Sequence, residues 1–108
     1  MYTKIYQIKT NTLADGKIAA SYVAEELGGL IAQYNMTALN ILLCKEGALY
    51  VTVNFDEAAD MKVFQTAQLE LFENLRTSLK CHTADFQAIP VFRYEREATN
   101  ATLESLAS

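Results

Sequence analysis

Two adjoining segments, Thr37–Cys44 and Ala48–Phe55, alternate like β-strands, and they constrain the fold more than any other part of the chain. A three-residue link with a glycine joins them, which predicts a β-hairpin. One face of the hairpin would be apolar, with Leu39, Ile41, Leu43, Leu49, Val51, Val53 and Phe55. The other would be mixed, with Asn40, Leu42, Cys44, Tyr50, Thr52 and Asn54. Because helices can cover only one of these faces, the mixed face needs a partner, a ligand or water.

The N-terminal third predicts a strand followed by a helix. Tyr2–Thr10 is rich in β-branched and aromatic residues, and its two-sided apolarity suits a central strand. The helix would begin after a cap at Asn11 or Thr12 and run to about Gln33 or Tyr34, with a bend or a close contact at its internal glycine pair.

The C-terminal half predicts a second helical region and a last strand. The helical region follows the Asp56-Glu57 pair, bends near Thr66–Gln68 and ends at Lys80. Phe86–Glu95 would be the strand, and Pro90 would place it at an edge or introduce a bulge. If Ile89 and Val91 face the helices, the mixed sheet face gains Phe86, Ala88, Phe92 and Tyr94.

The element order strand, helix, strand, strand, helix, strand predicts an α+β, ferredoxin-like βαββαβ fold. Its sheet would have four antiparallel strands with both helices on one face. We expect one domain over residues 1–97 and a tail over 98–108 that forms a short helix or is disordered. The apolar groups on the uncovered face predict a homodimer with sheet packed against sheet.

Composition excludes several classes of protein. The net charge is −4 and the basic residues are scattered, which argues against a nucleic-acid partner. No stretch reaches the length of a membrane span, and no secretory signal begins the chain, so we expect no membrane partner and a cytoplasmic location. Cys44 and Cys81 are then expected to be reduced thiols, buried or nearly so.

Two short stretches carry a family resemblance. Leu49–Val53 followed by Asn54–Ala59, together with Phe92–Glu95, resembles the antibiotic-biosynthesis-monooxygenase-like domains of the dimeric α/β-barrel superfamily, over about residues 2–96. The resemblance implies that two sheets form a barrel across a dimer. It also implies that the cleft between sheet and helices can hold a small aromatic or haem-like ligand. Asn54 stands where those domains often have a tryptophan, and this chain contains no tryptophan, which favours a binding role over oxygenase chemistry and leaves the expected fold unchanged.

The candidate pocket residues are Tyr6, Asn40, Tyr50, Asn54, His82 and Tyr94. Asn40 and Asn54 share a predicted face with Tyr50, where a carboxamide beside an aromatic ring can fix a carbonyl or a phenol. His82 is the only histidine, and the resemblance to haem-degrading members makes it the first position to check. A lone histidine cannot build a zinc site, so no metal and no cofactor are predicted.

The sequence favours a homodimeric protein that binds a small molecule such as an aromatic compound. One alternative is a cofactor-independent monooxygenase-like enzyme acting on an aromatic or polycyclic substrate. Another is an acidic protein-interaction module that docks through its open sheet face. The carboxylates offer no clear acid–base pair, so the catalytic residues of an enzyme stay unassigned.

Overall fold

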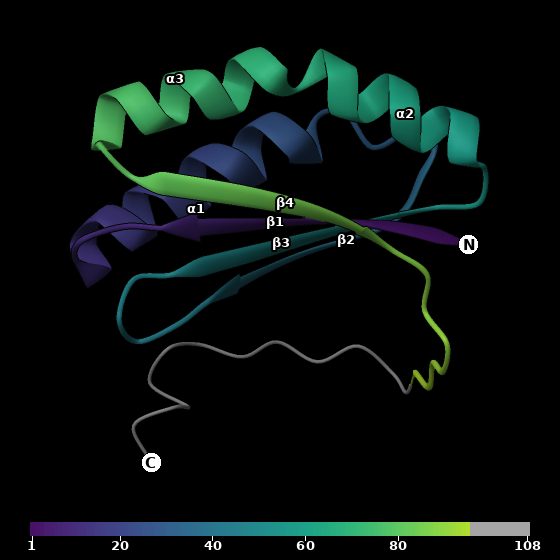
Figure 1. The fold of residues 1–108 in the computed structure, drawn as a ribbon, viewed down its shortest axis with the longest axis horizontal. Helices are drawn as coiled ribbons and strands as arrows, with labels where there is room; N and C mark the ends of the chain where they lie inside the picture. The colour runs from purple at the N-terminus through teal and green to yellow at the C-terminus, as the bar shows by residue number, and fades with distance from the viewer. Residues whose placement is uncertain (96–108) are drawn as a thin grey trace.

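The computed structural model describes residues 1–95, so the predicted tail 98–108 lies outside the described residues. The elements follow in the order β1 (Tyr2–Lys9), α1 (Leu13–Gly28), β2 (Met36–Leu43), β3 (Leu49–Phe55), α2 (Ala58–Ala67), α3 (Leu69–Leu79) and β4 (His82–Ala88). The helices form one layer and the sheet the other (Figure 1). The ferredoxin-like fold predicted from the sequence is confirmed, with its second helix divided into α2 and α3.

The sheet has four antiparallel strands in the order β2-β3-β1-β4. β1 is central, as its two-sided apolarity predicts, and β4 lies at an edge. The pairing sets the face of each strand, because directly opposite residues point to the same side. Tyr6 pairs with Val51 on one neighbour and with Asp85 on the other, so these three side chains face the helices.

The core fills the space between sheet and helices. Its fully buried large side chains come from two strands, β1 and β3, and two helices, α1 and α2: Ile8, Val23, Leu27, Leu49, Val51, Val53, Phe55 and Phe64. Leu39, Ile41 and Leu43 pack against this core from the other edge strand. The apolar hairpin face predicted from the sequence is therefore the face that the helices cover.

The turn between β2 and β3 holds the hairpin against the start of α1. Gly47 has φ +100°, a conformation that favours glycine, and the Cys44 amide donates to the Ala48 carbonyl at 2.8 Å. The Thr10 hydroxyl donates to the Gly47 carbonyl at 2.9 Å. A Cβ atom on Gly16 would lie 2.5 Å from that same carbonyl oxygen, so the helix approaches the turn closely at Gly16.

The first helix is shorter than predicted. Thr12 is its cap, accepting from the Asp15 amide at 3.1 Å, but the helix ends at Gly28 instead of continuing to Gln33 or Tyr34. Two adjacent glycines make helix continuation costly at this point. The chain then turns through Asn35, which has φ 56°, into β2.

The second helical region divides where the sequence predicts a bend. Gln68 is both the C-cap of α2 and the N-cap of α3, and its φ of −95° and ψ of 4° interrupt the helix. Lys80 ends α3 in the left-handed conformation, with φ 52°.

The predicted boundaries of the last strand are wrong. β4 spans His82–Ala88 rather than Phe86–Glu95. Pro90 cannot donate a ladder hydrogen bond, and the strand ends before it. Phe86 lies on the uncovered face, because it pairs with Ile5. Ile89 and Val91 are exposed instead of facing the helices, and Phe92 and Tyr94 lie beyond the strand.

Candidate functional site

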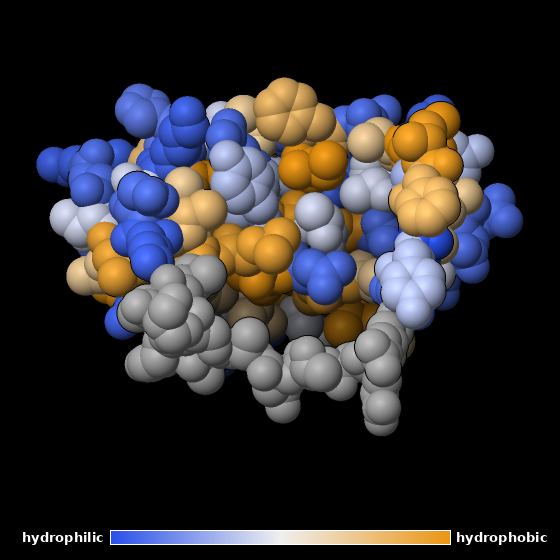
Figure 2. Space-filling view, turned by 90° about the horizontal axis from the view of Figure 1, so that it is seen from below, coloured by the Kyte–Doolittle hydropathy of each residue, from blue (hydrophilic) through white to orange (hydrophobic). Residues whose placement is uncertain are grey.

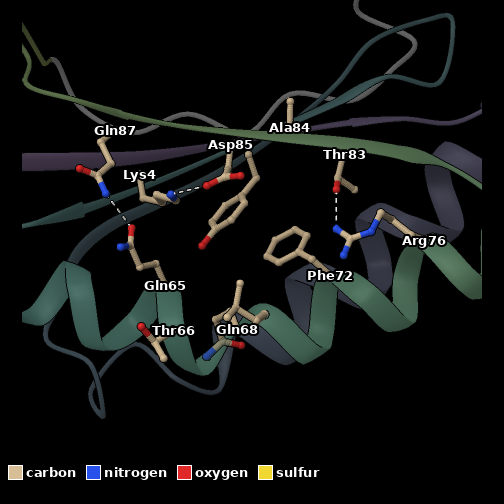
Figure 3. A pocket seen from close by; sticks show the side chains of 12 residues that line it. Lys4, Gln65, Thr66, Gln68, Phe72, Arg76, Thr83, Ala84, Asp85 and Gln87 are labelled. Carbon is tan, nitrogen blue, oxygen red and sulfur yellow. Dashed lines mark hydrogen bonds and ion pairs between the residues drawn. The ribbon is translucent and has the colours of Figure 1, made fainter.

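A cleft of about 310 Å³ lies between the β1–β4 half of the sheet and the helix pair α2–α3. Strand side chains point into it from one side and helix side chains from the other (Figure 3). Its lining residues are Lys4, Tyr6, Gln65, Thr66, Gln68, Leu69, Phe72, Arg76, Thr83, Ala84, Asp85 and Gln87. This volume is at the lower end of the roughly 300–1,000 Å³ that small-molecule sites occupy.

The cleft forms because polar residues, not apolar ones, line this edge of the covered face. Thr83, Asp85 and Gln87 alternate along β4; Thr83 and Gln87 meet the helices through hydrogen bonds, and Asp85 accepts from Lys4 on β1. The Gln87 amide donates to Gln65 Oε1 at 2.9 Å, and the Arg76 guanidinium donates to Thr83 Oγ1 at 2.7 Å. The two bridges lie on opposite sides of the lining residues (Figure 3). These two bridges hold the helices to β4, and the space of the cleft lies between the two bridges.

Tyr6 supplies a buried hydroxyl that has no hydrogen-bond partner among the described residues. The residue is only 6% exposed, and its ring stacks on Phe72 with a centroid separation of 4.1 Å and an interplanar angle of 15°. Burial raises the pKa of Tyr6 far above its ordinary value, and the negative charge of Asp85 raises it further. Tyr6 is therefore a neutral hydrogen-bond donor or acceptor that is free to meet a ligand.

Lys4 brings a buried positive charge to the same cleft. Its ammonium nitrogen lies 2.5 Å from Asp85 Oδ2, and it is 5.5 Å from the centroid of the Tyr6 ring. The Lys4 side chain is 5% exposed, whereas that of Asp85 is 58% exposed. The pair thus extends from the buried side of the cleft to its solvent edge, and burying Lys4 requires this carboxylate.

The structure separates the six candidate residues named from the sequence. Tyr6 lines the cleft, whereas Asn40, Tyr50 and Asn54 lie on the opposite, uncovered face of the sheet. There the Thr3 hydroxyl donates to Asn54 Oδ1 at 2.7 Å, and the Gln7 amide donates to the Tyr50 hydroxyl at 2.9 Å.

The other two candidates also lie outside the cleft. His82 is exposed at the first residue of β4, paired with Lys9, and Tyr94 is exposed beyond the strand. The cleft lining contains no histidine or cysteine, so its residues do not fit a haem held through such a ligand. Among residues 1–95, no cluster of histidine, cysteine and carboxylate side chains could hold a metal ion.

The uncovered face carries exposed apolar groups beside those polar candidates. Leu42 is 54% exposed and Phe86 53%, and both lie on strands at the edges of the sheet. Seen from the side opposite the helices, apolar surface runs across the middle of the molecule with polar groups around it (Figure 2). This is the mixed face that the hairpin pattern predicts.

Most residues of the cleft escaped prediction from the sequence. Lys4 shares its period-2 face with Tyr6 and Ile8, and a charge within an apolar face is a sign of a buried, paired group. The Thr83-Asp85-Gln87 alternation was hidden because the last strand was expected further along the chain. The places of Gln68 and Phe72 in the cleft depend on the break between α2 and α3, and the sequence does predict a bend there.

The two cysteines are free thiols. Cys81 is buried, and its sulfur donates to the Leu75 carbonyl at 3.6 Å, while Cys44 is half-buried next to the hairpin turn. Burial raises the pKa of the Cys81 thiol above its ordinary value. This keeps Cys81 protonated and unreactive, as expected for a structural cysteine. Within the described residues, no helix is both long and apolar enough to cross a bilayer.

No protein-family profile matches the chain. A search of curated proteins likewise gives no match. Solved structures do match. A dimeric ferredoxin-like protein from an uncultured marine organism has a TM-score of 0.68 at 8% identity, covering 86% of this chain and 97% of its own. A second such protein has a TM-score of 0.65 at 10% identity, with 88% and 98% covered.

A third match is named as a "putative antibiotic biosynthesis monooxygenase" from Deinococcus radiodurans. Its TM-score is 0.65 at 9% identity, with 94% of this chain and 99% of that chain covered. The resemblance found in the sequence is therefore confirmed as a resemblance of fold. At such low identities the likeness carries the fold alone, because one fold hosts many functions.

Proposed function

We propose that this chain is a homodimeric protein that binds a small molecule in the cleft between its sheet and α2–α3. The observation that carries the proposal is the Tyr6 hydroxyl, buried in the cleft without a partner within residues 1–95. An unsatisfied buried hydroxyl costs about 1–3 kcal/mol. A ligand that forms a hydrogen bond with this hydroxyl recovers the free energy, and a binding role therefore explains why the hydroxyl is buried without a partner.

The surroundings of Tyr6 support a binding role. Phe72 and Leu69 supply apolar contact area, and Gln68 and Arg76 supply polar groups around it. Small-molecule sites commonly combine apolar walls with a few convergent polar groups in this way.

The second part of the proposal is a dimer formed through the uncovered sheet face. Exposed Leu42 and Phe86 give this face an apolar character that soluble monomers seldom leave bare. Two matched structures are named as dimeric ferredoxin-like proteins, which supports the same arrangement here. In such a dimer, Asn40, Tyr50 and Asn54 would lie at the interface between the two copies.

Fluorescence offers a direct test of the ligand site, because the chain contains no tryptophan. Leu69→Trp places a single reporter at a lining residue that is 68% exposed. Val63→Trp, on the same helical region but not in the lining, is the matched control. We expect a screen of one- and two-ring aromatic compounds to give saturable changes in emission for Leu69→Trp only.

A screen in which no compound changes the emission of Leu69→Trp would contradict the binding role. Light scattering at micromolar concentration tests the dimer, for which we expect twice the chain mass of 12.1 kDa. A single species of the chain mass would overturn the dimer and favour a module that docks its open sheet face onto a different protein.

A further inference from the structure

We propose that the ligand is a flat, one- or two-ring aromatic molecule carrying an oxygen acceptor, preferably anionic, that receives a hydrogen bond from the Tyr6 hydroxyl. This inference rests on the proposed function, since it names the class of molecule that the cleft would bind.

The balance of donors and acceptors favours an acceptor on the ligand. Lys4 carries three N–H donors and Arg76 five. Asp85 and Thr83 are the side chains that accept from them within residues 1–95, and each takes only part of this capacity. The Tyr6 hydroxyl adds a further donor. A ligand with acceptor oxygens satisfies the spare donors of the buried Tyr6 hydroxyl and the buried Lys4 ammonium, whereas a ligand that only donates leaves these donors unsatisfied.

The charge of the lining points the same way. Lys4 and Arg76 contribute two positive charges and Asp85 one negative charge, so the lining has one positive charge in excess. Lys4 and Asp85 neutralise each other in their ion pair. Arg76 forms no ion pair with any residue in the described part of the chain, and its contact with Thr83 leaves its charge in place. An anion is therefore preferred over a cation.

The shape of the cleft favours flat rings. The stacked rings of Tyr6 and Phe72 form an aromatic wall, and Leu69 extends it toward solvent. Aromatic rings pack well against such a wall by offset stacking or edge contacts. The volume of about 310 Å³ suits one or two rings with a polar substituent.

Three probes share the same ring system and differ in charge and in hydrogen-bond acceptors: 2-naphthoate, 2-naphthamide and 2-naphthylmethylammonium. The measurement is isothermal titration calorimetry of the full chain at neutral pH. We expect 2-naphthoate to bind tightest, 2-naphthamide less tightly, and the ammonium probe at least about tenfold more weakly than 2-naphthoate.

Variants then test the assigned contact. Tyr6→Phe should weaken 2-naphthoate binding by about tenfold and leave the ammonium probe unchanged. Tyr50→Phe, the matched control on the uncovered face, should leave all three affinities as they are. Arg76→Gln should reduce the preference for 2-naphthoate over 2-naphthamide.

The outcomes distinguish this inference from the function on which it rests. Equal binding of all three probes, or binding that Tyr6→Phe leaves intact, overturns the acceptor assignment while the small-molecule role stands. Absence of binding by every probe and by every compound of the fluorescence screen overturns both.

Discussion

Lys4 and Asp85 form an ion pair between neighbouring strands, with the ammonium nitrogen 2.5 Å from the carboxylate oxygen and only the aspartate open to solvent. The lysine depends on this carboxylate, because a buried charge without a partner is strongly destabilising. The same pair shapes the wall of the cleft next to Tyr6.

Replacing Asp85 by asparagine should lower the free energy of unfolding by about 1–3 kcal/mol, since it leaves Lys4 buried without its counter-charge. The value is below that for a fully buried pair, because the Asp85 side chain is 58% exposed. Urea unfolding measures it. Glu46→Gln, at an exposed turn residue, removes the same charge and should change stability by less than about 0.5 kcal/mol. Equal effects of the two variants would contradict the role of the pair.

Replacing Tyr6 by phenylalanine should raise the stability of the ligand-free protein by about 1 kcal/mol, while it weakens ligand binding. The reason is that the variant removes a buried hydroxyl without a partner. Chemical denaturation without ligand is the measurement. A clear loss of stability would show that the hydroxyl is already satisfied.

Alkaline pH should widen this difference. An unfolded tyrosine ionises near pH 10, whereas folded Tyr6 has a higher pKa because of burial and Asp85. The stability that depends on neutral Tyr6 is thus complete below about pH 10 and is lost as the pH rises toward the folded value. In this range, the free energy of unfolding of Tyr6→Phe should rise relative to that of the wild type by about 1.4 kcal/mol per pH unit. A difference that stays constant between about pH 9 and pH 11 would argue against the raised pKa.

A methyl group at Gly16 should destabilise the fold by about 1–3 kcal/mol, because the Cβ of Gly16→Ala would lie 2.5 Å from the Gly47 carbonyl oxygen. Gly28→Ala is the matched control in the same helix. Its Cβ would meet nothing within 4 Å, so that variant should be neutral or slightly stabilising. Thermal unfolding of both variants tests the close approach of α1 to the hairpin turn, and similar melting temperatures would contradict it.

A charge on the uncovered sheet face should dissociate the proposed dimer. Leu42→Glu places a carboxylate where the side chain is 54% exposed in the single chain, so it should convert the dimer to a monomer while the protomer stays folded. Val63→Glu, on α2 and 61% exposed, is the control that should remain dimeric. Light scattering and circular dichroism together give the answer, and a Leu42→Glu dimer would place the interface elsewhere.

The sequence predicted the fold well where local patterns determine it. Alternation along the hairpin identified the covered face, and the break at Gln68 and the cap at Thr12 follow from local chemistry. The last strand was placed too far along the chain, because the apolar residues that follow β4 alternate like a strand. The observed strand ends at Ala88, before Pro90. The cleft was largely missed, since it depends on the register between β1 and β4, which the sequence does not reveal.

The proposed ligand binds between the sheet and α2–α3 and not on the uncovered face. Side-chain amide resonances in a ¹⁵N-labelled sample separate the two sites in one titration with 2-naphthoate. We expect the signals of Gln65, Gln68 and Gln87 to shift, because these residues line the cleft. Shifts confined to Asn40 and Asn54, on the opposite face, would contradict it.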